Sequence, residues 1–132
     1  MTDRATRIAE FLVAQGWGQA ERRPLADDAS FRRYERLRDE SRRAVLMDAP
    51  PPRENVGPFL DIDRILRDMN FSAPDIFAED RAAGLLLLED FGDATYTSAL
   101  AADPSCEAQL YTLAVDALIA LHRRFTGADG VP

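Results

Sequence analysis

The stretch PDIFAEDRAAGLLLLEDFGD, residues 74–93, decides the fold class of this chain. Residues 76–79 and 85–89 are short apolar runs, and the residues between them end in a glycine of the kind found in tight turns. This pattern predicts two antiparallel strands joined as a hairpin. Phe91-Gly92-Asp93 then breaks the pattern and ends the second strand.

Further strands are predicted upstream of this hairpin. Residues 21–25 and 43–48 have strand-like patterns, and Pro24 places the first of them at a sheet edge, because proline cannot donate to a neighbouring strand. A polar turn is expected at 26–30. Residues 31–38 remain open between helix and strand: their large apolar side chains recur every three positions, as in a helix, but the segment is short and lies between turns.

Helices are predicted at 3–15, at 94–101, from Asn55 to Met69, and from Asp103 to about Phe125. Asn55 and Asp103 are the expected N-caps, and the proline after Asp103 suits a first helical turn. The order is therefore one helix, three strands, a helix, a hairpin and two helices. That order predicts an α+β fold, a small antiparallel sheet of about five strands with a packed helix.

Composition bounds the function. The chain has 132 residues, 46% of them hydrophobic, which fits one globular domain. A single cysteine excludes an internal disulfide and a cysteine-based zinc cluster, and a single histidine excludes a histidine-rich metal site. No apolar run approaches the ~20 residues of a membrane helix, and the N-terminal segment is amphipathic rather than a signal peptide. We expect a cytoplasmic protein with no membrane partner.

The charge balance points away from nucleic acid. There are 16 basic residues against 23 acidic ones, for a net charge of −7, and every basic residue is arginine. The missing lysine removes Schiff-base chemistry and the lysine that commonly binds phosphate. Arginines cluster in residues 32–38, but Glu35, Asp39 and Glu40 interrupt them. We interpret this cluster as a solvated strand face paired with those acids, and a nucleic-acid patch as the weaker alternative.

Five stretches carry a family resemblance: DASFRRY (28–34), VLMDAPP (45–51), PFLD (58–61), LLLLEDFGD (85–93) and ALIALH (117–122). They resemble the N-terminal lobe of aminoglycoside-phosphotransferase-like kinases. The wording is most similar to bacterial anomeric sugar kinases that act on N-acetylmuramate and N-acetylglucosamine in cell-wall recycling. The resemblance implies a kinase-like N-lobe at 1–92, and a hinge exit with the first helices of a truncated C-lobe at 93–132. It also implies ATP and Mg²⁺ as cofactors and a sugar as acceptor.

The resemblance also implies site residues. The turn 26–30 would cover the ATP phosphates, residues 88–91 would be the hinge that pairs with adenine, and an acid on the second helix would lie beside the sheet. The implied nucleotide-binding residues are Ser30, Phe31, Ala44, Met47, Asp61, Leu88, Glu89, Asp90 and Phe91. The lysine of the family would fall near Met47, so another cation must replace it, and Arg32 or Arg33 is our hypothesis.

The catalytic half of such a kinase does not occur in these residues. It needs a His-x-Asp stretch followed by an asparagine, and we find no such sequence. Asp90-Phe91-Gly92 spells the metal-binding triplet of protein kinases, but it precedes Leu121-His122-Arg123-Arg124, the only candidate loop. We interpret it as the hinge exit. The chain alone is therefore predicted to be inactive, with no catalytic or metal-binding residue of its own and with a missing C-lobe as partner.

Other interpretations stay open. The chain could be a non-catalytic binding or regulatory module, or a truncated fragment that keeps the fold, and the acceptor could be an aminoglycoside, choline or homoserine. Several residues also have ordinary structural interpretations. Asp63 and Arg67 would form a solvated pair one helical turn apart, Cys106 would be structural, and the leucine stripe at 110–121 would pack in the core or between lobes.

Overall fold

The computed structural model describes residues 2–25 and 29–127, which form a five-stranded antiparallel sheet with helices, so the α+β prediction is confirmed. The strand order is β1-β2-β3-β5-β4, which places β1 at one edge, as Pro24 predicted. The strands are β1 (Glu21–Pro24), β2 (Arg33–Asp39), β3 (Arg42–Asp48), β4 (Ile76–Asp80) and β5 (Leu85–Leu88).

The segment left open between helix and strand is β2. It pairs with β3 along its whole length, from Arg33 opposite Asp48 to Asp39 opposite Arg42. The three-residue recurrence of apolar side chains was misleading because its members do not share a face. Phe31 precedes the strand and is 57% exposed, whereas Tyr34 and Leu37 belong to clusters on opposite sides of the sheet.

The helices are α1 (Arg4–Ala14), α2 (Gly57–Asp68), α3 (Tyr96–Ala102), a 3₁₀ turn η1 (Pro104–Cys106) and α4 (Glu107–Arg124). Both predicted caps of the longer helices were wrong. Asn55 lies one residue too early: its Oδ1 accepts from the N–H of Gly57 at 2.9 Å, and Val56 is the N-cap. Asp103 caps η1 instead, accepting from the N–H of Ser105 at 3.1 Å, so Cys106 precedes α4.

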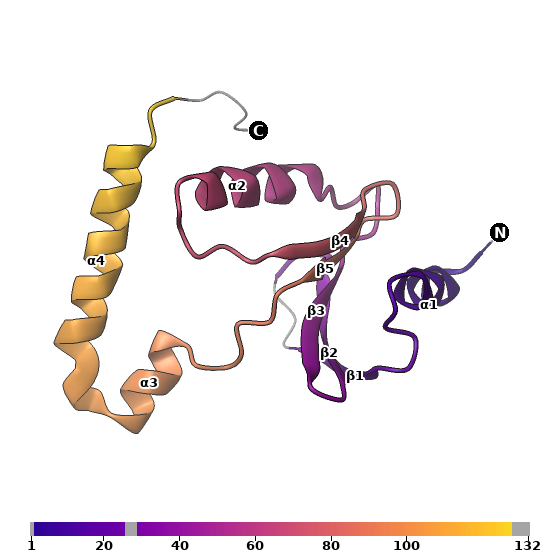
Figure 1. Ribbon diagram of the computed structural model, residues 1–132, viewed down its shortest axis with the longest axis horizontal. Coiled ribbons are helices and arrows are strands. Elements are labelled where there is room, and N and C mark those ends of the chain that lie inside the picture. Colours follow the sequence, from indigo (N-terminus) through magenta and orange to yellow (C-terminus); the bar gives the residue numbers. More distant parts are fainter. Residues whose placement is uncertain (1, 26–28, 128–132) are drawn as a thin grey trace.

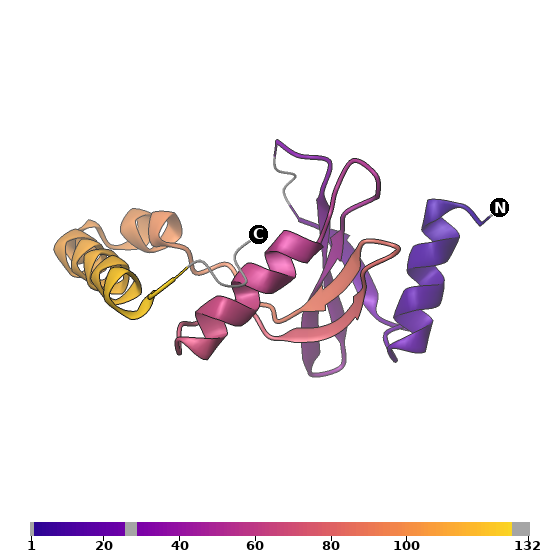
Figure 2. The same ribbon diagram turned by 90° about the horizontal axis from the view of Figure 1, so that it is seen from above.

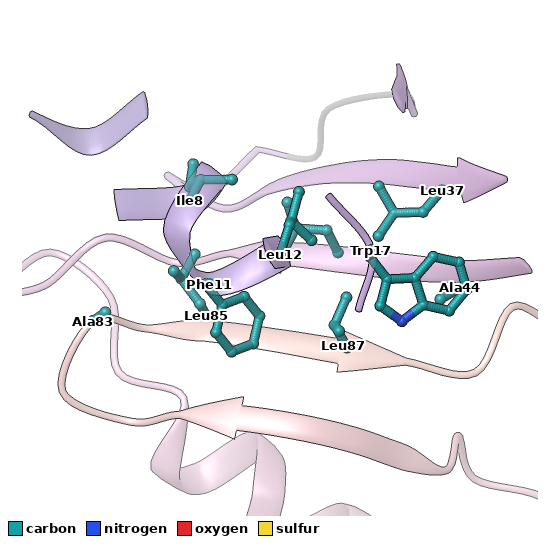
Figure 3. Close-up of a cluster of buried hydrophobic side chains, with 10 residues drawn as sticks. Ile8, Phe11, Leu12, Trp17, Leu37, Ala44, Ala83, Leu85 and Leu87 are labelled. Atoms are coloured by element: carbon teal, nitrogen blue, oxygen red, sulfur yellow. The ribbon is translucent and has the colours of Figure 1, made fainter. Parts of the chain in front are cut away.

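The sheet lies between two helices that cover opposite faces, α1 on one side and α2 on the other (Figure 2). The α1 side holds the larger core cluster, in which Trp17 and the apolar residues of α1 pack on β2, β3 and β5 (Figure 3). Because side chains alternate along a strand, Ala44 and Leu46 point to α1, whereas Met47 points to α2. The two faces therefore have separate cores.

The C-terminal helices lie apart from the sheet. In both views α3 and α4 stand beyond α2 (Figure 1, Figure 2). One link is at the end of α4, where Nη1 of Arg124 donates to the carbonyl of Met69 at 2.9 Å. No residue of α4 is buried by the described part of the chain. Its large exposed apolar side chains are Tyr111, Leu113, Val115, Leu118 and Ile119.

Membrane insertion of a helix finds no support in the described residues. None of the helices there combines the length and the apolar character needed to cross a bilayer.

Candidate functional site

The α2 side of the sheet carries most of the residues that the sequence singled out. Met47 is fully buried there, next to Leu86 and Leu88 of β5. Ala44 lies instead in the α1-side cluster, so the structure does not bring Ala44 and Met47 together. Val45 is half-buried on the α2 side and pairs with Leu88 across the strands. Sequence reasoning missed Val45, although its spacing of two from Met47 was the signal.

The segment after β5 leaves hydrogen-bonding backbone groups free. The N–H of Glu89 donates to the carbonyl of Asp75 at 2.9 Å, and the N–H of Asp75 donates back to Oε1 of Glu89 at 3.1 Å. The N–H groups of Asp90 and Phe91 have no partner within residues 2–25 and 29–127. This segment therefore presents two backbone donors, while the N–H of Glu89 is already used.

The carboxylate of Asp90 is held by an arginine on β2. The side chain of Asp90 is 2% exposed. Nε of Arg36 donates to Oδ2 at 2.7 Å, Nη2 donates to Oδ1 at 3.1 Å, and the N–H of Gly92 also donates to Oδ1, at 2.8 Å. The hydrogen bonds from Arg36 lower the pKa of Asp90 against the effect of burial. Asp90 is thus a structural carboxylate that closes a turn, and both of its oxygens are occupied.

Arg36 was expected to pair with acids of its own strand region, and that expectation was wrong. Besides Asp90, it contacts Asp93, with Nη1 at 2.9 Å from Oδ2. Glu35 pairs with Arg22 on β1, and Asp39 pairs with Arg42. The reason is the alternation of the strand, which puts Glu35 and Arg36 on opposite faces of the sheet.

The residues before β2 are braced by Glu54. The N–H of Phe31 donates to Oε1 of Glu54 at 3.2 Å, and Nε of Arg32 donates to Oε2 at 2.9 Å. Oγ of Ser30 accepts from the N–H of Arg32 at 3.1 Å. Part of the predicted turn, residues 26–28, lies outside the described residues. Among those described, Phe31 and Arg32 both bind the carboxylate of Glu54, and Ser30 contacts Arg32.

Arg32 and Arg33 lie on different sides of the sheet. Arg32 is near α2, with its guanidinium carbon 6.0 Å from the ring centre of Phe59. Arg33 pairs with Asp48, whose side chain binds Arg4 of α1 at 2.5 Å, so Arg33 belongs to the α1 side. The structure therefore groups Arg32, and not Arg33, with Met47.

The acids of α2 are placed differently from expectation. Asp61 is half-buried, 4.0 Å from Arg64, and borders a hollow of about 440 Å³ between α2 and β4 that the described residues 89–93 do not line. Asp63 is 5% exposed, so it is not the solvated residue we expected. Its Oδ1 has no hydrogen-bond partner among the described residues. Arg67 pairs with Asp75 instead, at 2.7 Å.

A signal for the burial of Asp63 was present in the sequence. Val56, Leu60 and Asp63 are spaced by four and three residues, which places them on one helix face, and the first two are buried. Asp63 also borders a groove of about 380 Å³ that Arg32 and Phe59 line.

We expect Asp63→Asn to stabilise the protein at neutral pH by about 1–2 kcal/mol, because it removes a buried charge that forms no hydrogen bond or ion pair within the described residues. Burial raises the pKa of Asp63 above its ordinary value of 3.8. The protonated form is therefore favoured in the folded state. The contribution of protonated Asp63 to the unfolding free energy is complete below pH 3.8, and it is lost as the pH rises through the folded-state pKa. The advantage of the variant should grow over that window.

Urea unfolding followed by the fluorescence of Trp17, which is 6% exposed and the only tryptophan, measures this effect. Asp61→Asn, on the same helix, is the matched control and should change the unfolding free energy by less than about 0.5 kcal/mol. An Asp63→Asn variant that is less stable than the parent at pH 7 would contradict the assignment of an unpaired charge.

A divalent metal would need several oxygen ligands at one point. Among residues 2–25 and 29–127, no three histidine, cysteine, aspartate or glutamate side chains are grouped to hold one. The described residues therefore do not fit a resident Mg²⁺ ion.

A five-stranded antiparallel sheet with α2 packed on one face and an exit segment after β5 is the N-lobe architecture of protein-kinase-like phosphotransferases. Residues 21–130 match the phosphotransferase enzyme family. The chain belongs to that family.

Named relatives narrow the comparison. The chain is 42% identical over 119 residues to the N-acetylmuramate/N-acetylglucosamine kinase of Pseudomonas aeruginosa, a match that covers 88% of this chain and 35% of the relative. It is 41% identical over 120 residues to the kinase of the same name from Pseudomonas putida, with 89% and 35% covered. The Caulobacter vibrioides kinase of that name is 34% identical over 148 residues, with 92% and 40% covered. The chain thus spans 35–40% of the length of these relatives.

Proposed function

We propose that this chain is the ATP-binding lobe of a kinase that transfers the γ-phosphate of ATP to a hydroxyl of an amino sugar. The observation that carries the proposal is that the segment after β5 places backbone N–H groups beside an apolar surface. The two free N–H groups of Asp90 and Phe91 lie directly after Leu88, which pairs with the half-buried Val45. An adenine ring needs hydrogen-bond partners at its edge and apolar surface at its faces, and this segment offers both.

The phosphates would lie at the other end of the same face, near Arg32. The hydroxyl of Ser30 accepts from the backbone N–H of Arg32, and the side chain of Arg32 is only half-buried. Arginine binds phosphate oxygens with its planar fork and neutralises their charge, which is the main task of such a lobe. Glu54 orients Arg32 through the bond at 2.9 Å. Arg32 is therefore our choice for the cation that replaces the missing lysine.

The remaining parts of the reaction are proposed to come from residues beyond this chain. No His-x-Asp stretch with a following asparagine occurs in the sequence. The uncovered apolar side of α4 supports a further lobe packed against it. The amino-sugar acceptor and its anomeric hydroxyl are proposed from the names of the relatives and from the sequence motifs. Mg²⁺ would arrive with the nucleotide. A cytoplasmic location, without nucleic-acid or membrane partners, completes the proposal.

The first test is ATP titration by calorimetry with two neighbouring variants. Arg32→Met should weaken ATP affinity about tenfold, because it removes a charge-assisted contact and leaves Glu54 without its ion-pair partner. Arg33→Met is the matched control and should change the affinity less than about twofold, since Arg33 lies on the α1 side.

Two outcomes would count against this assignment. A larger loss from Arg33→Met than from Arg32→Met would move the phosphates to the other face. If the parent protein shows no saturable ATP binding at all, the nucleotide-binding function itself is wrong.

A further inference from the structure

We propose that Arg36 is a positioning residue, whose guanidinium fixes the conformation of residues 89–93 and thereby presents the free N–H groups of Asp90 and Phe91 to a nucleotide base. The first part of this inference concerns the protein alone. The second part rests on the proposed function.

The contacts form a two-sided clamp. Arg36 uses Nε and Nη2 on Asp90, and Nη1 and Nη2 on Asp93, at 2.7–3.1 Å. Two carboxylates on one planar guanidinium fix both distance and orientation, which a single ion pair does not. The pair with Asp90 is also shielded: the side chains of Arg36 and Asp90 are 17% and 2% exposed.

The clamp determines the turn between its two carboxylates. Oδ1 of Asp90 accepts from Arg36 and also from the N–H of Gly92, whose φ of +79° is the conformation that glycine tolerates. Asp93 holds the next element, because its carbonyl accepts from the N–H of Thr95 and from the hydroxyl of Ser98, at the start of α3. One guanidinium therefore joins β2, the turn and the start of α3.

The position of Arg36 explains why the clamp matters for a base. Arg36 lies opposite Val45 in the β2–β3 register, and Val45 lies opposite Leu88 in the β3–β5 register. The clamp is thus adjacent to the apolar surface proposed for adenine. Because all three nitrogens of Arg36 already bind carboxylates, it is not available to phosphate. Its role is to shape the hinge and not to contact the ligand.

The test compares Arg36→Met with Arg38→Met in the full chain. Arg38 is exposed and lies two residues further along the same strand, and its side chain makes no hydrogen bond or ion pair within the described residues. Amide hydrogen exchange of residues 89–93 is measured without nucleotide, and ATP affinity is measured by calorimetry. We expect Arg36→Met to speed exchange at Gly92 about tenfold and to weaken ATP binding about tenfold, as the loss of a charge-assisted fork implies.

Two more variants keep the test decisive. Arg36→Lys should keep less than half of the exchange protection and ATP affinity that Arg36→Met loses, because an ammonium cannot span both carboxylates. Asp93→Asn, which weakens one arm at an 82% exposed side chain, should act in the same direction with a smaller size. It remains informative even if Arg36→Met does not fold.

The results separate the two parts. Unchanged exchange at 89–93 in a folded Arg36→Met or in Asp93→Asn would overturn the inference. Faster exchange in a protein whose parent binds no ATP would support the clamp and overturn the proposed function. Faster exchange with unchanged ATP affinity would overturn the link between the clamp and the base.

Discussion

Gly84→Ala should lower the unfolding free energy by about 3–5 kcal/mol, because Gly84 combines a positive φ with a close backbone contact. Its φ is +67°, in the turn between β4 and β5. A Cβ at this position would overlap the carbonyl oxygen of Ala49 and would lie 3.2 Å from Cδ of Pro51. Both neighbours are parts of the backbone or of a ring, so neither can rotate away.

The surrounding bonds prevent the turn from moving as a unit. The N–H of Ala49 donates to the carbonyl of Gly84 at 2.8 Å, and Ala49 is fully buried. Arg4 of α1 donates to the carbonyl of Ala83 and, through Nε at 2.9 Å, to Asp48 at the end of β3. Relief of the clash would therefore break contacts among α1, β3 and the hairpin together.

Gly16→Ala is the matched control for this prediction. Gly16 has a φ of +82°, but a Cβ there would meet no atom of the described residues within 4 Å. Gly16→Ala should therefore lower the unfolding free energy only by the strain of the left-handed conformation, about 1 kcal/mol. Urea unfolding followed by Trp17 fluorescence compares the two variants. Equal losses would mean that the contact with Ala49 does not constrain the turn.

The elements of the fold could be predicted because their signals are local. The β4–β5 hairpin, the edge position of β1 and the strand β3 follow from alternation, turn residues and proline placement within a few positions. The predictions of the N-caps were wrong because a capping residue type a few positions before the true helix start cannot be told from the real cap by sequence alone. Asn55 and Asp103 do accept backbone hydrogen bonds, but one starts a turn before α2 and the other starts η1.

The site was only partly predictable because its contacts are distant in sequence. The partners of Arg36 are 54 and 57 residues away, and no periodicity connects them. The family resemblance implied Ala44 together with Met47, and Arg33 was a hypothesis for the missing cation, but strand alternation puts Ala44 and Arg33 on the α1 side. Val45 could have been predicted, because alternate residues of a strand share a face and Val45 lies two positions from Met47. Local sequence patterns therefore predict the strands and helices of the lobe, whereas the contacts of Arg36 with Asp90 and Asp93 can be seen only in the folded structure.

The largest expected effect concerns phosphoryl transfer itself. A chimera that joins residues 1–124 to the C-terminal region of the Pseudomonas aeruginosa relative should phosphorylate N-acetylmuramate with ATP. The chain alone should not exceed the uncatalysed background, because the function proposed for it is to bind and neutralise phosphates and its sequence has no catalytic loop. The difference in rate should be at least about 10⁶-fold, the lower range of enzymatic acceleration.

A coupled assay for ADP, with mass spectrometry of the sugar product, measures this difference. The C-terminal region alone is the negative control, and the relative's own two halves joined at the same point are the positive control. In the chimera, Arg36→Met should raise the KM for ATP more than it lowers kcat, because a positioning residue of the hinge acts on binding. Sugar phosphate formed by the chain alone would overturn the division of the site. An inactive chimera beside an active positive control would show that this lobe is not the ATP-binding half of such a kinase.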